Sequence, residues 1–239
     1  MFTATSKYNL WPQASKHTQW PGEGVMGDPI FDSFYKSNVP SVNDPGYQQT
    51  AVQTAGAELL DKINKRVVLI GHSQGGLLPL LVADARPALV EALILLEPAG
   101  PPFRNLPVFG GGPARAWGPT DVRITYSPEV NDPDTELVKK VQPPRGEGFE
   151  ECILQADDPP PRQLVNLMDK PILMITGEAS YHMTHDYCLA RYLVQAGCKK
   201  TKHLELGEMG IHGNGHMFFM EKNSDDIFKI LHDWIKELR

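Results

Sequence analysis

The sequence has few cysteines, no long apolar stretch and no excess of positive charge. Its three cysteines, Cys152, Cys188 and Cys198, lack C-x-x-C spacing, which excludes a disulfide scaffold and a zinc knuckle but leaves one disulfide open. No run of 18 apolar residues occurs, so we expect no membrane span. Residues 1–7 lack the apolar segment of a signal peptide, and by default we expect a cytoplasmic protein.

The composition fits one globular domain. The formal net charge of −6 argues against nucleic acid or an acidic membrane surface as the main partner, since both select basic patches. Apolar residues make up 41% and charged residues 22%, which are ordinary shares for a globular protein. At 239 residues, the chain is long enough to bury a substantial core, and we expect a single domain over residues 1–239.

Apolar runs alternate with helical patterns along the chain. The runs predict strands at 66–70, 92–96, 171–176 and 202–206, and helices are predicted at 47–64, 74–85, 185–196 and 224–238. This alternation indicates an α/β fold, a parallel sheet with helices on both faces. We expect Ser224 to cap the last helix, whereas Pro79 is awkward inside the second one because it removes a backbone hydrogen bond.

Residues 98–149 differ from the rest of the chain. This segment is dense in proline and glycine and contains no strong helical pattern. A long insertion at the carboxyl ends of strands typically forms a lid or a pocket wall. A flexible surface excursion is the alternative, but the aromatic residues Phe103, Phe109, Trp117 and Tyr126 favour a packed lid.

The pentapeptide Gly71-His72-Ser73-Gln74-Gly75 joins a predicted buried strand to a predicted helix. Gly-x-Ser-x-Gly in that context is the nucleophile elbow of α/β-hydrolases, in which the serine sits at the tip of a tight turn. We expect the turn to be so tight that Gly71 and Gly75 have no room for a side chain. Ser73 is therefore the candidate nucleophile, with a structural turn as the alternative.

A histidine after the last predicted strand supplies the candidate general base. His216 lies in Gly215-His216 before an apolar segment, and an imidazole on such a loop can take the serine proton at neutral pH. His212 is the second choice. His72 is interpreted as a packing residue. His182 and His185 resemble a metal pair, but a solvated helix start explains them better, and we expect no metal site.

The candidate acid is Glu97, at the carboxyl end of the fully apolar strand 92–96. A carboxylate at the mouth of a buried strand is costly unless a partner such as a histidine N–H compensates it. In most α/β-hydrolases the acid follows a later strand, where this sequence has Gly177-Glu178-Ala179-Ser180. Glu178 is therefore the reserve candidate.

These motifs together resemble a branch of the α/β-hydrolase superfamily. The segments Leu96-Glu97-Pro98, Gln19-Trp20-Pro21-Gly22 and Gly213-Asn214-Gly215-His216 carry the likeness. That branch is a bacterial and fungal esterase group whose triad acid is a glutamate after the strand next to the nucleophile strand. The resemblance implies a Ser73-His216-Glu97 triad and an ester hydrolase without a metal or organic cofactor.

The sequence also departs from that group. Its members carry further strands, and a His-Gly-Gly-type oxyanion loop, before the region where this sequence begins, and residues 1–64 contain no such loop. The backbone N–H of Gln74 is then the remaining oxyanion donor. We expect a shortened hydrolase whose nucleophile strand lies at the sheet edge, where self-association is favoured.

The expected activity is cleavage of a carboxylic ester or lactone of a small molecule through an acyl-enzyme. A catalytically impaired binding protein is the alternative, because loss of an oxyanion donor typically costs ~10²–10³ in rate. Peroxidation on the same triad stays open, whereas Ser73 argues against dehalogenation, which uses an aspartate nucleophile.

Overall fold

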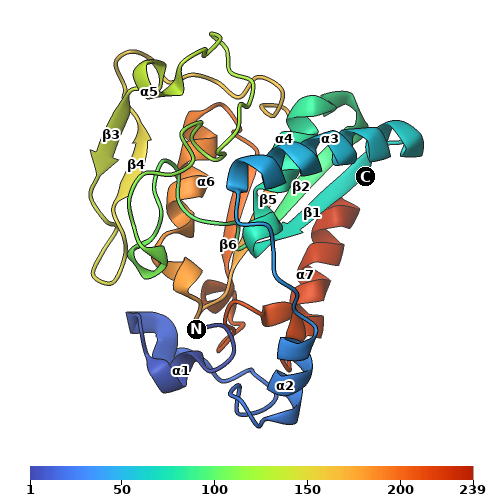
Figure 1. Cartoon of the computed structure of the whole chain (residues 1–239), viewed down its shortest axis with the longest axis vertical. Helices are drawn as coiled ribbons and strands as arrows, with labels where there is room; N and C mark the ends of the chain where they lie inside the picture. The colour runs from blue at the N-terminus through green and yellow to red at the C-terminus, as the bar shows by residue number, and fades with distance from the viewer. Residues whose placement is uncertain (239) are drawn as a thin grey trace. The chain divides into compact units, whose positions relative to one another are not determined.

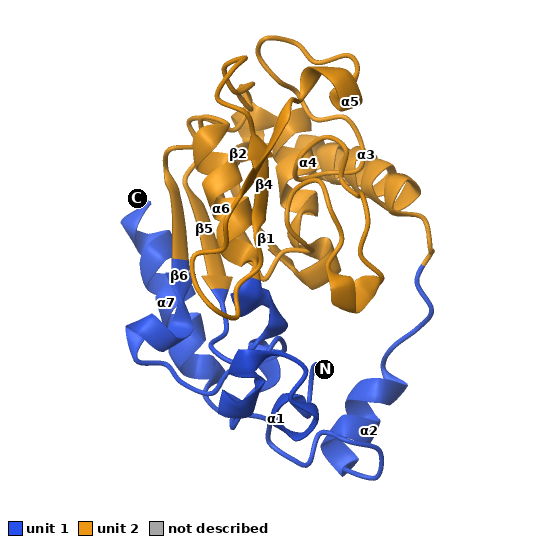
Figure 2. Ribbon diagram, turned by 90° about the vertical axis from the view of Figure 1, so that its left-hand side faces the viewer, with its two compact units in different colours: residues 1–41, 176–184, 204–239 blue, residues 42–175, 185–203 orange. Residues whose placement is uncertain are grey.

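The computed structural model describes residues 1–238, which form two compact units (Figure 2). Unit 1 comprises residues 1–41, 176–184 and 204–239, and unit 2 comprises residues 42–175 and 185–203. Each unit therefore draws on segments that are distant in the sequence, and each is described by itself below.

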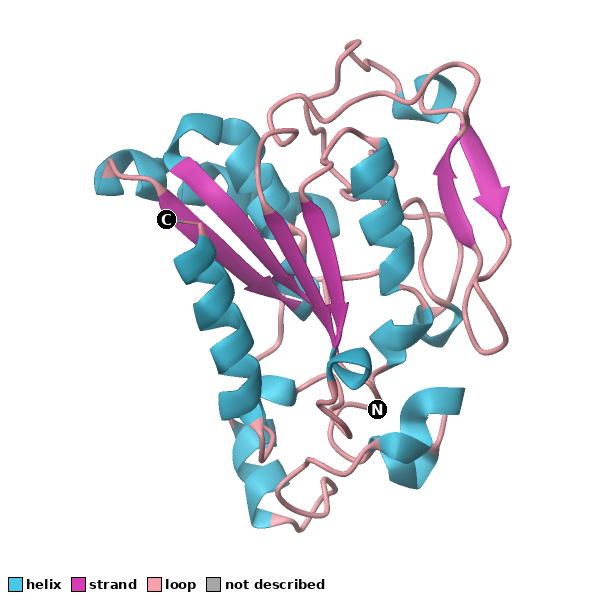
Figure 3. Cartoon of the chain, turned by 180° about the vertical axis from the view of Figure 1, so that it is seen from behind, coloured by secondary structure: helices cyan, strands magenta, loops and turns pink. Residues whose placement is uncertain are grey.

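Unit 2 is built on a parallel sheet (Figures 1 and 3). The strand order is β1-β2-β5-β6, where the strands are β1 (Val67–His72), β2 (Val90–Leu96), β5 (Ile172–Thr176) and β6 (Thr201–Glu205). The four predicted strands are thus confirmed, but the expectation that the first is buried was wrong, because every residue of β1 is at least partly exposed. The last residues of β5 and β6 belong to unit 1.

The nucleophile strand lies at the edge of the described sheet. β1 pairs with β2 in parallel register, from Val67↔Val90 to His72↔Leu96. Ile70 on β1 is 54% exposed, in contrast to the fully buried Ile94 with which it pairs. The expected edge position is confirmed, and self-association through this edge stays a prediction.

The helices of unit 2 lie close to their predicted positions. They are α3 (Pro45–Ile63), α4 (Leu78–Ala85) and α6 (Asp186–Gln195). Pro79 is accommodated because the chain runs first through a 3-10 turn and α4 begins only at Leu78. A proline in the first helical turn removes no intrahelical hydrogen bond. Leu80, Leu81 and the apolar residues of β2 then form the centre of the core.

The insertion at 98–149 is packed in part against this core. Phe103 and Tyr126 are each 4% exposed, and the Tyr126 hydroxyl lies 2.6 Å from that of Tyr192 on α6. Phe109, in contrast, is 50% exposed. Trp117 is partly buried and also packs against the core. The predicted packing is therefore confirmed for three of the four aromatic residues, and the lid role stays a prediction.

An antiparallel hairpin, β3 (Lys139–Gln142) with β4 (Cys152–Gln155), was missed by the sequence analysis, as was the short helix α5 (Pro133–Glu136). A disulfide joins Cys152 on β4 to Cys188 on α6, and Cys198 is buried with a free thiol. The one disulfide that the sequence left open is therefore present. The pattern Lys-Lys-Val-Gln of β3 is too short and too polar to signal a strand.

Unit 1 contains the helices α1 (Thr5–Tyr8), α2 (Pro29–Lys36) and α7 (Ser224–Glu237). Asp28 caps α2 by accepting from the Ile30 N–H, and it also accepts from Gly24 N and Trp20 Nε1. Ser224 does not cap α7 as expected, because the cap position is Asn223 and no side chain bonds there. Along α7, Ile227 is buried, whereas Phe228 is 62% exposed.

The remaining turns are 3-10 segments. They are Pro12–Lys16, Ser73–Gly76, Pro87–Leu89, Pro107–Phe109, Tyr181–Thr184, Leu206–Met209 and Phe218–Met220. Within residues 1–238, no strand precedes β1, and no helix combines the length and the hydropathy that a bilayer crossing needs.

Candidate active site

Ser73 stands at a sharp turn between strand and helix. β1 ends at His72, the 3-10 turn begins at Ser73, and Ser73 has a φ of 55°, in the left-handed region that non-glycine residues rarely adopt. Such backbone strain is typical of the nucleophile elbow, in which it exposes the serine oxygen at the end of the strand. The predicted elbow is therefore confirmed as a local structure.

Two of the glycines around Ser73 are required by close approach. A Cβ on Gly71 would lie 2.4 Å from the carbonyl oxygen of Gly75, and a Cβ on Gly76 would lie 2.5 Å from Pro98 Cα. Gly75 is different, because nothing lies within 4 Å of a Cβ built there. The expectation that both glycines of the pentapeptide are sterically required was wrong for Gly75, and Gly76 takes that role.

Glu97 follows β2 at the same sheet edge. Because His72 pairs with Leu96 in the parallel register, the next residues, Ser73 and Glu97, leave their strands side by side. Ala99 lies two residues after Glu97, and its N–H donates to the carbonyl of Ser73 at 2.9 Å. Glu97 is completely buried, with a φ of 45°, and its N–H donates to Ile175 O on β5. A buried carboxylate held in a strained turn points to a functional group rather than to a surface ion pair.

His216 lies on a buried loop of unit 1, and its side chain is only 2% exposed. The loop is organised by the carboxylate of Glu221, which is itself buried. Its oxygens accept from the Gly215 N–H and from Asn214 Nδ2, and one lies 2.7 Å from His17 Nε2. These bonds fix the backbone directly before His216, so Glu221 and His17 position the candidate base.

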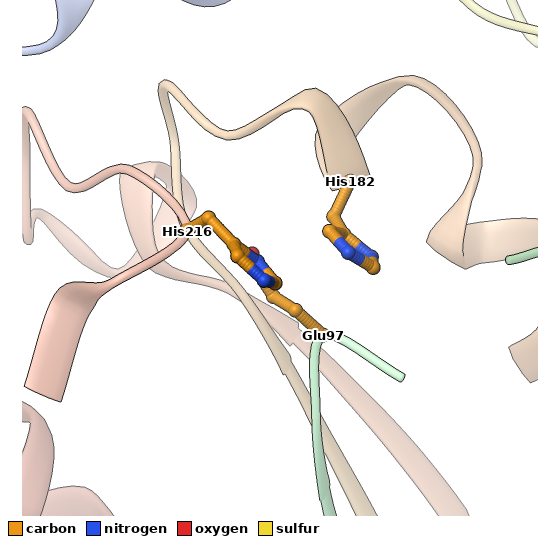
Figure 4. Close-up of side chains that lie close together, drawn as sticks. All are labelled: Glu97, His182 and His216. Carbon is orange, nitrogen blue, oxygen red and sulfur yellow. The ribbon is translucent and has the colours of Figure 1, made fainter. Parts of the chain in front are cut away.

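The ring of His216 is enclosed by aromatic side chains of unit 1. His182 stacks on it (Figure 4). The two ring centroids are 4.8 Å apart and the ring planes differ by 4°. The rings of Phe2 and Tyr181 each lie 5.1 Å from it. Figure 4 also labels Glu97, at the end of β2.

The histidines expected at a solvated helix start are in fact buried. His182 is 1% exposed and His185 is fully buried, so this expectation was wrong. Their burial was not predicted because His182 lies in a short 3-10 turn and His185 at a helix start, where no apolar period marks a buried face. His182 and His216 offer ring nitrogens within 4.8 Å of one another and are the pair in unit 1 that could contribute to a metal site. Acyl transfer by a serine needs no metal.

The reserve candidates form a separate group. Glu178 accepts from Lys16 Nζ and from the Gly213 N–H, and it lies 3.3 Å from His212 Nδ1. Burial alone would raise the pKa of Glu178, but these hydrogen bonds lower it below its usual value. His212 has a side chain that is 65% exposed. Glu178 therefore serves as an anchor for the segment that leads to His216.

Gln74, the candidate oxyanion donor, directs its side chain away to α3. Its Nε2 donates to Gln48 Oε1 at 2.6 Å. This contact fixes the residue that follows the nucleophile, while the role of its backbone N–H stays a prediction. The structure thus places Ser73, Gln74 and Glu97 together in unit 2 and His216 in unit 1, and the triad as a whole stays a prediction.

Comparison with known proteins agrees with the α/β fold. The model of the alpha/beta hydrolase family matches residues 17–230. The chain belongs to this family. It is 44% identical over 237 residues to a protein named "Probable secreted lipase phiG" from Fungal sp. (strain ATCC 74256). That alignment covers 99% of this chain and 64% of the relative, so the chain spans less than two thirds of the relative's length.

Solved structures of hydrolases are more distant. A bacterial esterase is 18% identical with a TM-score of 0.49, and the match covers 87% of this chain and 50% of that one. A monoacylglycerol lipase of Paleococcus ferrophilus is 16% identical with a TM-score of 0.45, covering 80% of this chain and 76% of that one.

Proposed function

We propose that this α/β-hydrolase is a serine ester hydrolase with Ser73 as nucleophile, His216 as general base and Glu97 as the acid that orients the histidine. The elbow carries the proposal: Ser73 directly follows strand β1, has a left-handed backbone and adjoins a buried carboxylate. Family membership and the name of the 44% identical relative, a lipase, support it.

The proposed reaction has two steps. His216 removes the proton from the Ser73 hydroxyl as its oxygen attacks the ester carbonyl, and the tetrahedral oxyanion is stabilised by the Gln74 N–H. The histidine then gives its proton to the departing alcohol. In the second step, water gives a proton to His216 and attacks the acyl-enzyme. His216 then returns that proton to Ser73 Oγ as the bond to the acyl group breaks, which releases the acid and regenerates Ser73. Glu97 stabilises the imidazolium that forms in each step.

The decisive test is turnover of p-nitrophenyl butyrate by the unmutated chain and by Ser73→Ala. We expect the substitution to lower kcat/KM by at least about 10⁴-fold, since without the nucleophile only substrate binding and oxyanion stabilisation remain. Ser41→Ala, an exposed serine outside the site, is the matched control and keeps its activity. Equal turnover by the Ser73 and Ser41 variants would reject the proposal.

A fluorophosphonate probe separates an enzyme from an impaired binding protein. An activated serine forms a covalent adduct with the probe, whereas an unactivated one does not. We expect a stoichiometric adduct on the peptide that contains Ser73. An intact family fold with no adduct would instead favour the binding protein.

We further propose that the chain matures in an oxidising compartment, in place of the cytoplasm that the composition suggested by default. The Cys152–Cys188 disulfide supports this, because structural disulfides persist mainly in such compartments. The relative is named as secreted. Alkylation of the natively expressed protein under denaturing conditions tests it: one modified thiol, at Cys198, is expected, and three would refute it.

A further inference from the structure

Arg115 is a buried cation in the insertion of unit 2, and its guanidinium makes no hydrogen bond to a carboxylate of the described residues, although the charge of Asp121 acts on it. Its side chain is enclosed, with 7% of the residue exposed. Nε donates to Pro101 O at 2.8 Å, and Nη1 donates to Asn105 Oδ1 at 3.3 Å. Nη2 is buried and has no hydrogen-bond partner. Asp121 accepts from the backbone N–H of Arg115 and not from its guanidinium.

This arrangement is energetically unfavourable as it stands. A buried donor normally has an acceptor, since its omission costs on the order of 1–3 kcal/mol. Burial lowers the pKa of Arg115 to about 10, so the guanidinium is still protonated at neutral pH. Arg115 also has a φ of 49°, a strained conformation for an arginine.

The guanidinium is adjacent to the loop of the nucleophile and the acid. A Cβ built on Gly100 would lie 2.7 Å from Arg115 Nη2, so the guanidinium packs directly against the Gly100 backbone. Ala99, the preceding residue, donates its N–H to Ser73 O, and Glu97 lies two residues before Ala99. Arg115 Nη2 therefore packs against Gly100, the residue next to Ala99, which bonds to the nucleophile's carbonyl.

A second arginine in the insertion shows what is missing. Arg104 Nη2 lies 3.2 Å from Glu150 Oε2 and donates to Glu151 O, so its charge is balanced by a carboxylate. Each arginine has one buried donor without a partner, Nε of Arg104 and Nη2 of Arg115, but only the Arg104 guanidinium is in direct contact with a carboxylate. Asn105, which accepts from Nη1, is half-buried. A ligand that contacts the Asn105 amide from solvent would therefore be separated from the guanidinium only by that side chain.

We propose that Arg115 and Asn105 bind a carboxylate of the substrate, so that the preferred ester carries a free carboxylate at the far end of its acyl chain. This rests on the proposed ester hydrolysis and names its substrate class. A guanidinium fork binds a carboxylate through parallel hydrogen bonds, and one guanidinium balances one such charge. The Asn105 amide adds a neutral donor at the rim of the subsite.

The test compares two esters with one leaving group, mono-p-nitrophenyl glutarate and neutral p-nitrophenyl butyrate. The measured quantity is the ratio of their kcat/KM values. We expect Arg115→Gln to lower this ratio about 10- to 100-fold, as loss of a charge-assisted bond does. Arg115→Lys keeps the charge but loses the fork, and we expect a smaller decrease. Arg104→Gln is the matched control and leaves the ratio as it is in the unmutated chain.

A binding measurement tests the carboxylate subsite at Arg115 independently of ester hydrolysis. Glutarate is expected to raise the melting temperature of the unmutated chain, whereas neutral glutaramide is not, and Arg115→Lys reduces the increase. This readout holds even where Arg115→Gln fails to fold or where Ser73 proves not to be a nucleophile. An unchanged ratio in both Arg115 variants, or equal effects of glutarate and glutaramide, would overturn the subsite.

Discussion

Ser73 and Glu97 leave two neighbouring parallel strands at the same level, and both do so with a left-handed backbone, at φ values of 55° and 45°. The Ala99 N–H joins the two turns by donating to Ser73 O at 2.9 Å. Two strained non-glycine residues joined in this way indicate that the sheet edge is built to hold a hydroxyl and a carboxylate in fixed places.

The identity of the acid can be tested by two glutamine substitutions. We expect Glu97→Gln to lower kcat by about 10³-fold or more, because an amide no longer stabilises the imidazolium or selects its tautomer. Glu178→Gln is the matched control, since Glu178 bonds Lys16 and the Gly213 N–H. We expect it to lower kcat less than about tenfold. The opposite ranking would transfer the acid role to Glu178.

The elbow glycines differ in their tolerance of a methyl group. Gly71→Ala is expected to lower the free energy of unfolding by about 1–3 kcal/mol, because its Cβ would meet the Gly75 carbonyl at 2.4 Å. Gly75→Ala is expected to change it by less than about 0.5 kcal/mol, since its Cβ enters open space. Urea unfolding measures both, and equal destabilisation would contradict the difference.

The loop of the candidate base depends on Glu221. Glu221→Gln replaces an acceptor oxygen with an amide N–H₂ that faces other donors, the Gly215 N–H and Asn214 Nδ2 among them. We expect a loss of about 2–4 kcal/mol of stability and a clear decrease in kcat. Glu208→Gln, at an exposed position, is the control and should leave both unchanged. Full activity of Glu221→Gln would show that the loop is held by other contacts.

Glu178 makes part of the stability dependent on pH. Its pKa is lower in the folded protein than the ordinary 4.5, so the contribution is complete above that value and is lost as the pH falls through the folded pKa. We expect the unmutated chain to be more stable than Glu178→Gln at pH 7, and the difference to shrink steadily below about pH 4.5. Unfolding midpoints from pH 7 to pH 3 measure it, and a constant difference would be inconsistent with the lowered pKa.

The sheet, the elbow and the two candidate residues of unit 2 follow from local signals. Apolar runs mark the strands, and Gly-x-Ser-x-Gly after such a run predicts the turn at Ser73. Glu97 was found because a charge directly after five apolar residues needs a compensating partner. Each of these inferences depends on residues that are adjacent in the chain.

The contacts that the sequence analysis missed leave no motif or periodic pattern in the chain. His17 and Glu221 are 204 positions apart, and neither lies in a motif that reveals the pair. The burial of Arg115 depends on Gly100, Pro101 and Asn105 folding over it, which a proline- and glycine-rich segment does not encode by periodicity. The β3–β4 hairpin was missed because its strands are short and β3 is exposed.

The place of β1 in the described sheet leaves the nucleophile supported from one flank. Every register pair of this strand is with β2, so a distortion of that single ladder displaces the serine with no second ladder to restrain it. Reinforcing the open flank, for example with a fused or designed strand, is therefore the direct route to a more rigid nucleophile. A strand from another chain that paired with this open edge of β1 would directly affect the position of Ser73.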